Sequence, residues 1–321
     1  MISEQVSIII PGSNFTDELK KTVSILKQSK IAYEIIFITN LDLKTFSENV
    51  KVVKTNLKNI SQKRNFGVNQ SSGNYIAFID SDAYPSINWL ENGIKILKDS
   101  TSIGLVTGPD VVDKNINFLK FIIGNAHKSF ILSGKNYFRK YKNTSSEVLN
   151  AFSCNMIMKK KIYLDIKGMN ESLYIAEDLE FSKRINKLKK IFFSKDVFVY
   201  HTPRDFIPFL FQRFSYGYEI INIFKNLNFF SKISYLMPLI ILITFIISLI
   251  FKFNILISIP LFFMISCFLF ESVRITHKSY YFLFYFFILV FGTIAFGTGT
   301  LLKLLKINLN IKKIYTFRNY I

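Results

Sequence analysis

The chain contains little cysteine, which argues against two kinds of structure. Only Cys154 and Cys267 occur in 321 residues, and they lie far apart. This spacing implies neither a disulfide framework nor a zinc site, so we interpret Cys154 as a small buried thiol. The first five residues, Met1-Ile2-Ser3-Glu4-Gln5, lack a charged start and a long apolar core. We therefore expect no signal peptide, and a first part of the chain that stays in the cytoplasm.

Acidic residues are also scarce. The chain has 22 Asp and Glu against 41 Lys and Arg, a net charge of +19, which suits nucleic acid, an anionic membrane surface or an anionic substrate. No compact basic cluster with interleaved aromatic residues stands out, so we expect no nucleic-acid partner. Lysine-rich stretches such as 183–195 and 303–318 flank an apolar region, which favours contact with the cytoplasmic, anionic leaflet of a membrane.

Charge almost disappears between residues 235 and 302. Three apolar segments lie there: Tyr235–Phe251, Phe253–Phe270 and Tyr280–Leu302. A membrane span needs about 20 residues, so the segments predict two or three crossings; the alternative is buried helices of a soluble domain. A third crossing would place the basic tail outside, against the positive-inside tendency. Otherwise Gly292, Gly297 and Gly299 would break the third segment into a re-entrant or interfacial element.

The first part of the chain alternates strand and helix patterns. Buried strands are expected at Val6–Ile10, Tyr33–Ile38, Val50–Val53 and Tyr75–Ile79, and helices at Asp17–Lys30 and Ser61–Gln70. This alternation predicts βαβ units and a mostly parallel sheet, the α/β class.

Four regions follow from these patterns. They are an α/β domain over 1–204, an amphipathic interface segment over 205–234, a transmembrane region over 235–302 and a basic tail over 303–321. The interface segment alternates aromatic and polar residues, as a helix lying in the membrane surface does. An ordinary helix packed on the soluble core is the alternative.

Two carboxylates stand at the end of the strand Tyr75–Ile79. Asp80 and Asp82 flank Ser81, and ligands bind at the carboxyl edge of open α/β sheets. Such a pair can hold a hard divalent cation, which can neutralise a diphosphate. Taken alone, the pattern is also that of a solvated turn.

A second acidic pair, Glu177-Asp178, precedes a helical pattern that begins at Leu179. Carboxylates in a first helical turn are stabilised by the helix dipole, so simple capping is one reading. The other reading is a general base that deprotonates a hydroxyl.

Several motifs in order resemble the family 2 glycosyltransferases, which have a GT-A fold, over about residues 5 to 217. The motifs are Val6 to Pro11 with Ser13 and Asn14, Arg64-Asn65-Phe66-Gly67, Ser72 to Asp82, Cys154-Asn155-Met156, Gly168 to Leu173, and Glu177-Asp178. The resemblance implies a Rossmann-like GT-A domain in the cytoplasm, followed by a small helical membrane domain.

The resemblance also implies roles for residues. Asp82, Asp80 and His201 would hold Mg²⁺ or Mn²⁺, and Asp178 would be the base, with Glu177 as the neighbouring alternative. The nucleotide-sugar donor would be bound by Pro11, Ser13, Asn14, Thr39, Asn40, Arg64, Asp80 and Ser81.

Two further segments carry alternatives. His201, in Tyr200-His201-Thr202-Pro203-Arg204, would complete the metal shell or hold a phosphate oxygen, or it is a structural histidine. Gln212 and Arg213 resemble a Gln/Arg segment of membrane-linked members and would contact a diphosphate or a lipid-borne phosphate. An arginine snorkelling at the lipid interface is the alternative.

One position departs from the family pattern. After Glu34 to Ile38 the family usually carries an Asp pair, and here Thr39-Asn40 stands in its place. The acceptor-only carboxylate is missing, which leaves the identity of the donor open.

These motifs predict a multi-pass membrane-anchored, inverting, metal-dependent glycosyltransferase of the cell membrane. Its acceptor would be membrane-associated, either a polyprenyl phosphate or a lipid-linked saccharide. The alternative is an inactive membrane scaffold that keeps the GT-A fold. A transporter built on the apolar segments is disfavoured, since they hold almost no intramembrane charge.

Overall fold

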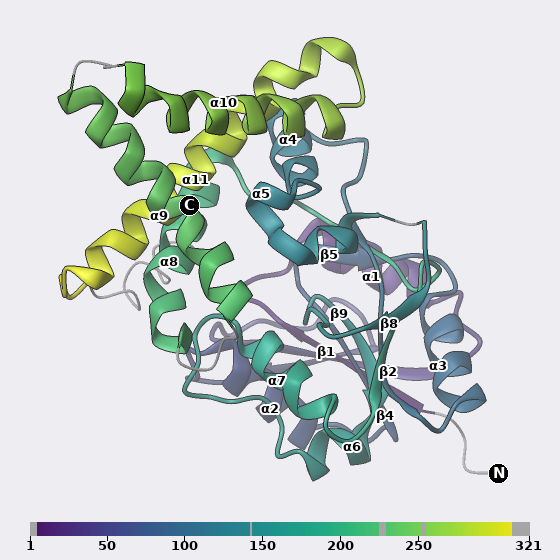
Figure 1. The fold of residues 1–321 in the computed structure, drawn as a ribbon. Coiled ribbons are helices and arrows are strands. Elements are labelled where there is room, and N and C mark those ends of the chain that lie inside the picture. The colour runs from purple at the N-terminus through teal and green to yellow at the C-terminus, as the bar shows by residue number, and fades with distance from the viewer. Residues whose placement is uncertain (1–4, 142, 225–228, 252–254, 310–321) are drawn as a thin grey trace. The chain divides into compact units, whose positions relative to one another are not determined.

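The chain divides into two compact units. The computed structural model describes residues 5–141, 143–224, 229–251 and 255–309. The first unit comprises Met1–Asp113 and Arg139–Thr202, and the second comprises Lys114–Phe138 and Pro203–Ile321 (Figure 1). We call them the sheet unit and the helical unit.

The sheet unit is built on an eight-stranded sheet of order β3-β2-β1-β4-β9-β6-β10-β8. The strands are β1 (Gln5–Pro11), β2 (Ala32–Thr39), β3 (Val50–Lys54), β4 (Tyr75–Ile79), β6 (Ile103–Thr107), β8 (Ser146–Val148), β9 (Asn155–Lys159) and β10 (Lys190–Phe193). Strands β8 and β9 run antiparallel to their neighbours, and the others are parallel to one another. The prediction of a mostly parallel sheet is confirmed.

Helices cover both faces of this sheet (Figure 1). They are α1 (Asp17–Leu26), α2 (Ile60–Asn69), α3 (Trp89–Asp99), α6 (Lys160–Asp165) and α7 (Glu177–Ile185). Alternate residues of a strand point to opposite faces. Ile8 and Ile10 of β1 therefore join a core with α1 and α3, whereas Ile9 joins a second core with α2, α6 and α7.

The parallel arrangement gathers several strand ends at one edge. In register, β1 pairs Ile9 with Phe78 of β4, and Pro11 with Ile38 of β2. The chain that follows β1, β2 and β4 therefore emerges at a common carboxyl edge. A small second sheet of order β5-β11-β7 adds to the unit, with β5 (Ala83–Pro85), β7 (Asp110–Val111) and β11 (Val199–His201).

The helical unit contains long apolar helices and two short ones. They are α4 (Phe118–Ala126), α5 (Phe130–Ser133), α8 (Phe206–Ile223), α9 (Phe229–Ile250), α10 (Ile255–Ile275) and α11 (Phe282–Leu304). Two 3₁₀ turns are also present, η3 (Ser279–Tyr281) and η1 (Gly134–Lys140), whose last two residues belong to the sheet unit.

Residues 114–138 differ from their predicted assignment. The sequence placed all of 1–204 in one α/β domain, whereas this segment groups with the C-terminal helices. The reason is apolar packing: Ile122, Ile123 and Ala126 share a core with Ile288 and Leu289 of α11. The other boundary between the two units lies between residues 202 and 203; the predicted division into four regions stays a prediction.

Helix α8 occupies most of the predicted interface segment, and it packs along α11. A Cβ added to Gly217 would lie 1.9 Å from the carbonyl oxygen of Phe296, and one added to Gly299 would lie 2.1 Å from that of Phe214. The two glycines therefore permit a close approach of the helix backbones. Residues 225–228 of the predicted segment lie outside the described residues.

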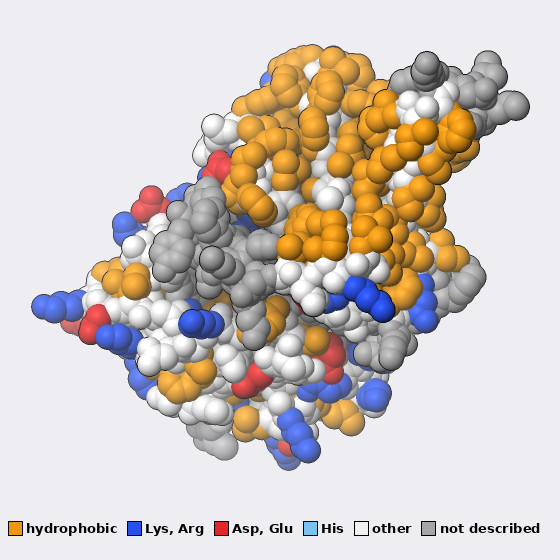
Figure 2. All heavy atoms as spheres, turned by 90° about the vertical axis from the view of Figure 1, so that its left-hand side faces the viewer, with side chains coloured by type: hydrophobic (Ala, Val, Ile, Leu, Met, Phe, Trp, Pro, Cys, Tyr) orange, Lys and Arg blue, Asp and Glu red, His pale blue; other side chains and the backbone are white. Residues whose placement is uncertain are grey.

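Two helices in the described part of the chain are long and apolar enough to cross a membrane, Lys232–Ile250 and Phe282–Leu304. The third predicted segment is one continuous helix, with no break at Gly292, Gly297 or Gly299. The second predicted crossing begins at residues 253–254, outside the described part, and stays a prediction; so does the tail beyond residue 309. Hydrophobic side chains gather on the surface of these helices (Figure 2).

Candidate active site at the carboxyl edge of the sheet

Three potential metal ligands meet where β4 ends. Oxygen atoms of Asp80 and Asp82 and a ring nitrogen of His201 all lie within 4.8 Å of one another. Strand β11 pairs His201 with Ala83 of β5, and the Thr202 backbone N–H donates to the Asp82 carbonyl at 2.9 Å. The His201 Nε2 atom consequently faces Asp82 Oδ1 at 3.4 Å. Two carboxylates and one imidazole form a donor set that suits Mn²⁺ or a similar divalent cation.

Arg64 of α2 joins this cluster to the second acidic pair. Its guanidinium donates to Asp80 Oδ1 at 2.8 Å and to Glu177 Oε1 at 3.2 Å, and only 3 % of its side chain is exposed. Burial alone would lower the pKa of Arg64, but the two carboxylates outweigh it and raise the pKa. Arg64 therefore remains charged and holds Asp80 and Glu177 on either side of one cation.

Glu177 and Asp178 begin α7, as predicted from the sequence. In the second core Phe181 packs against Tyr163, whose ring packs in turn against Phe78 of β4, which fixes the helix against the sheet. The Ser182 hydroxyl donates to the Asp178 carbonyl at 2.7 Å and accepts from the Ala151 N–H at 2.9 Å. The Ser182 side chain, in the second turn of α7, therefore links the first turn of the helix to Ala151.

The segment before α7 is hydrogen-bonded to α2, and its last residue, Ala176, has a strained backbone conformation. The Asn65 side chain donates to the Met169 carbonyl and accepts from the Met169 N–H, both at 2.9 Å. Ala176, the N-cap residue, has φ 59°, which is left-handed and unusual for a residue other than glycine. Such strain occurs where surrounding contacts determine the backbone, often at functional sites.

Asp178 lies among charges of both signs. Burial, followed by the negative charge of Glu177, raises the pKa of Asp178 to about 7, against the opposing charges of Arg139 and Arg64. The Leu179 N–H also donates to its carboxylate at 2.9 Å. A carboxylate with a pKa near neutrality is suited to accept a proton from a hydroxyl.

A buried ion cluster near this edge was not predicted. Arg139 donates two hydrogen bonds to Asp110, at 2.7 and 2.6 Å, and Lys140 adds a third at 2.6 Å. Burial alone would raise the pKa of Asp110, but the charges of Arg139 and Lys140 hold it well below its usual value. The available signal was Asp110 itself, a carboxylate shortly after the strand Ile103–Thr107; nothing local pointed to its partners.

The predicted donor residues line the loops at the same edge. Thr39 is buried and donates to the Ser13 carbonyl at 2.9 Å. Both amide hydrogens of Asn40 are used by the carbonyls of Thr55 and Leu57, at 2.7 and 2.8 Å. The Asn40 side-chain oxygen is the group left to accept from a ligand.

The other predicted donor residues form short loop contacts. Pro11 ends β1, and the Asn14 side chain accepts from the Phe15 N–H at 2.8 Å. The Ser81 carbonyl accepts a hydrogen bond from the Thr16 hydroxyl, the N-cap of α1. The donor-binding roles of these residues stay predictions.

Gln212 and Arg213 belong to α8 of the helical unit. Arg213 is 5 % exposed and donates to the carbonyls of Leu132 and Gly292, at 3.0 and 3.4 Å. Gln212 donates to the Tyr216 hydroxyl at 3.2 Å. The buried contacts of Arg213 are those of a packed side chain, and a phosphate-binding role for the pair stays a prediction.

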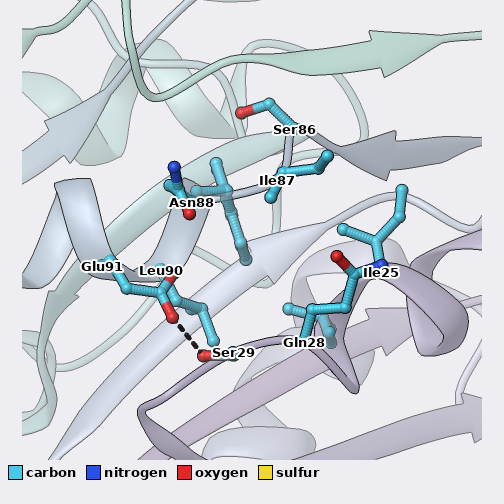
Figure 3. Close-up of a pocket in the computed structure, with 10 residues that line it drawn as sticks. Ile25, Gln28, Ser29, Ser86, Ile87, Asn88, Leu90 and Glu91 are labelled. Carbon is cyan, nitrogen blue, oxygen red and sulfur yellow. Dashed lines mark hydrogen bonds between the residues drawn. The ribbon is translucent and has the colours of Figure 1, made fainter.

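A small pocket between α1 and α3 includes Ser29, which donates to Glu91 at 2.7 Å (Figure 3). None of its lining residues belongs to the predicted site.

Comparisons with known proteins agree with the motifs. Residues 7–166 match the family model described as glycosyl transferase family 2. Glycosyltransferase AglE of Haloferax volcanii is 27% identical over 227 residues, which cover 66% of this chain and 71% of that protein. Poly(ribitol-phosphate) beta-N-acetylglucosaminyltransferase TarP of Staphylococcus aureus is 26% identical over 219 residues, covering 57% of this chain and 66% of that protein.

Two further similarities cover less than half of the matched protein. An uncharacterized glycosyltransferase of Rickettsia bellii is 30% identical over 128 residues, which cover 37% of this chain but only 19% of that protein. The crystal structure of GalNAc-T7 with UDP, GalNAc and Mn²⁺ has a TM-score of 0.48 and 14% identity, covering 63% of this chain and 44% of that one. The likeness is too distant to carry an argument about ligands.

The matched segment contains the strand that leads to Asp80 and Asp82 and most strands of the mostly parallel sheet, which the alternation of strand and helix patterns predicted. Residues 7–166 therefore form a glycosyl transferase family 2 domain, and its fold is GT-A-like.

Proposed function

We propose that this glycosyltransferase is membrane-anchored, metal-dependent and inverting, and that it moves a sugar from a nucleotide-sugar donor to a lipid-linked acceptor. The observation that carries the proposal is the pairing of two carboxylate sites through Arg64. One site, at Asp80 and Asp82, has a metal-type donor set, and the other, at Glu177 and Asp178, has a carboxylate suited to a base. Direct displacement with inversion needs both kinds of site.

The residues divide the work as follows. Asp80, Asp82 and His201 would hold a divalent cation, which would stabilise negative charge on the departing nucleoside diphosphate. Arg64 keeps one oxygen of Asp80 occupied at 2.8 Å and leaves the other oxygen for the cation. Asp178 accepts the proton of the acceptor hydroxyl, and Glu177 keeps the pKa of Asp178 high.

The acceptor and location are inferred from the helical unit and the relatives. Two helices have the length and composition of membrane spans, so the enzyme would be anchored in the cell membrane, with its sheet unit in the cytoplasm. TarP is named for transfer to poly(ribitol-phosphate), an acceptor with phosphates. A polyprenyl phosphate or a lipid-linked saccharide fits a membrane-held active site.

One assay tests the proposal. Membranes that carry the protein receive labelled nucleotide sugars, Mn²⁺ or Mg²⁺ and a lipid extract, and label in the lipid phase is measured. We expect transfer that is abolished by EDTA, by Asp82→Asn and by Asp178→Asn. Asp165→Asn, an exposed aspartate on α6, is the matched control and should transfer normally.

The outcomes separate the alternatives. Full transfer by Asp178→Asn would remove Asp178 as the base. Transfer that survives EDTA would remove the metal. If no donor supports either transfer or donor hydrolysis, the inactive scaffold is the better description.

A further inference from the structure

Residues 114–138 belong to the helical unit but are inserted in the sequence of the sheet unit; we call this segment the excursion. An ion pair joins residues on either side of it. Asp110 lies just before the exit, and Arg139 is the first residue after the return. Their two hydrogen bonds, at 2.7 and 2.6 Å, hold the two ends of the segment together within the sheet unit. Both ends of the segment 114–138 are therefore fixed to the sheet unit.

Helix α4, the first element of the excursion, is apolar along one face. In its later turns this face buries Ile122 and Ile123 in the core of the helical unit. One turn earlier on the same face, Phe118 (41 %) and Leu119 (40 %) are exposed, and Phe130 at the start of α5 is 50 % exposed. A helix end that faced water would carry polar residues there, so these exposed side chains indicate an apolar contact.

The exposed face continues the apolar surface of a candidate membrane span. The Phe118 ring packs edge-on against Tyr281 and Phe284, with ring centroids 5.2 and 5.0 Å apart. On α11, Leu283, Phe284 and Phe287 are themselves exposed. The start of α11 and the start of α4 thus present one apolar surface.

Basic residues and tyrosines border this surface. Lys278 lies 6.0 and 5.7 Å from the ring centroids of Tyr280 and Tyr281. The Lys128 Nζ atom lies 3.2 Å from the His277 Nε2 atom. Burial lowers the pKa of His277, and the charges of Lys128 and Lys114 lower it further. Tyrosine and lysine at an apolar edge are typical of the membrane–water interface, where anionic lipids attract basic residues.

We propose that the segment 114–138 is a second membrane-contact element, which inserts Phe118, Leu119 and Phe130 into the headgroup–acyl boundary of a leaflet containing anionic lipid. The inference rests on the membrane location in the proposed function. The segment returns to the sheet unit at Arg139, whose positive charge favours the ionised form of Asp178.

Site-specific labelling of the full chain tests this. The exposed Cys267 is replaced by Ser, the buried Cys154 is kept, and a cysteine is introduced as Leu119→Cys or Phe130→Cys and labelled with an environment-sensitive fluorophore. Leu188→Cys is the matched control, because Leu188 is an exposed leucine (59 %) of the sheet unit. The proteins are placed in phosphatidylcholine vesicles with or without phosphatidylglycerol.

We expect emission at Leu119→Cys and Phe130→Cys to shift to the blue, to be quenched by brominated lipid and to resist aqueous iodide. At Leu188→Cys we expect no blue shift, no quenching by brominated lipid, and quenching by aqueous iodide. Iodide quenching equal to that of Leu188→Cys would overturn the proposal. Protection from both quenchers would also overturn it, because a protein partner or a second copy would then cover the face.

The readout does not depend on sugar transfer. If transfer to lipid fails while lipid quenching persists, the proposed acceptor is wrong and the membrane contact stands. If transfer to lipid succeeds without lipid quenching, the proposed acceptor stands and the membrane contact of residues 114–138 is wrong. Weaker quenching without phosphatidylglycerol is the expected mark of the basic border.

Discussion

The ionisation of Asp178 depends on burial and on three neighbouring charges. Burial and the negative charge of Glu177 disfavour the ionised form, whereas Arg139 and Arg64 favour it. A base must be deprotonated to act, and the pKa of Asp178 is raised to about 7. We therefore expect the rate of sugar transfer to rise with pH through about 7 and then level off. Initial rates between pH 5.5 and 8.5, measured at saturating donor and metal, provide the measurement. A rate independent of pH across this range would contradict the assignment.

Removing the neighbouring charge should shift that profile. In Glu177→Gln the like charge that raises the pKa of Asp178 is lost, so the rising limb should move to lower pH, whatever the change in maximal rate. Glu180→Gln, in the same first turn of α7 but paired with Arg184 at 2.8 Å, is the control. Its profile should match that of the unaltered protein.

Arg64 is a buried cation with two separate partners, and lysine cannot replace it. A lysine presents one compact charge and cannot bridge Asp80 and Glu177 in the planar fork that arginine offers. Leaving buried charges unpaired costs about 3–5 kcal/mol, so Arg64→Ala should be strongly destabilised in chemical unfolding, and Arg64→Lys less so. Arg184→Lys, which alters a partly exposed pair with Glu180, should change stability by less than about 1 kcal/mol.

At the scale of elements, the first turn of α7 carries the acidic pair Glu177-Asp178, and the packing of Phe181 fixes the position of α7. The Phe181 side chain is completely buried in the core beneath the sheet. Phe181→Ala should cost about 3–5 kcal/mol through lost burial and a cavity. Urea unfolding measures this loss, and transfer activity should fall with it because the first turn of α7 loosens. Phe181→Leu should keep most of both.

The entry to α7 is a second element-scale determinant. At Ala176, with φ 59°, a β-branched residue would be strained further, whereas glycine adopts this backbone freely. Ala176→Val should therefore lower stability and transfer, and Ala176→Gly should remain within about 1 kcal/mol of the unaltered protein. Thermal unfolding and initial rates distinguish the two. Equal behaviour of both variants would mean that the backbone here relaxes at no cost.

At the scale of the molecule, the two units are interleaved along the chain. A protein truncated after residue 202 would keep 114–138 but lose the helices that cover it. Ile122 and Ile123, both buried in the full chain, would be exposed, and the fragment should aggregate. Replacing 114–138 by a short Gly/Ser linker should restore a soluble monomer, because Asp110 and Arg139 already hold the ends together. Size-exclusion chromatography compares the two fragments.

Most local elements could be predicted because their causes are local. Alternating and continuous apolar runs located β1 to β4 within a residue or two, and the acidic pair was correctly placed at the start of α7. The two candidate spans were evident from apolar length alone. Asp80 and Asp82 were found because a carboxylate pair after a buried strand marks a sheet edge.

Long-range partners could not be read in the same way. The Asp110–Arg139 pair, the approach of His201 to Asp82 and the departure of 114–138 from the sheet unit all join residues that are distant in sequence. Periodicity specifies which face of an element is apolar, but not which other element will cover it.

The sequence by itself determined the strands, the helices and the carboxylates at their ends, because backbone preference and apolar spacing act over a few residues. Only the tertiary structure decided that Arg64 bridges Asp80 and Glu177 and that α8 packs along α11. Those outcomes depend on the order of strands in the sheet and on how closely helix backbones can approach, and both are properties of the folded chain.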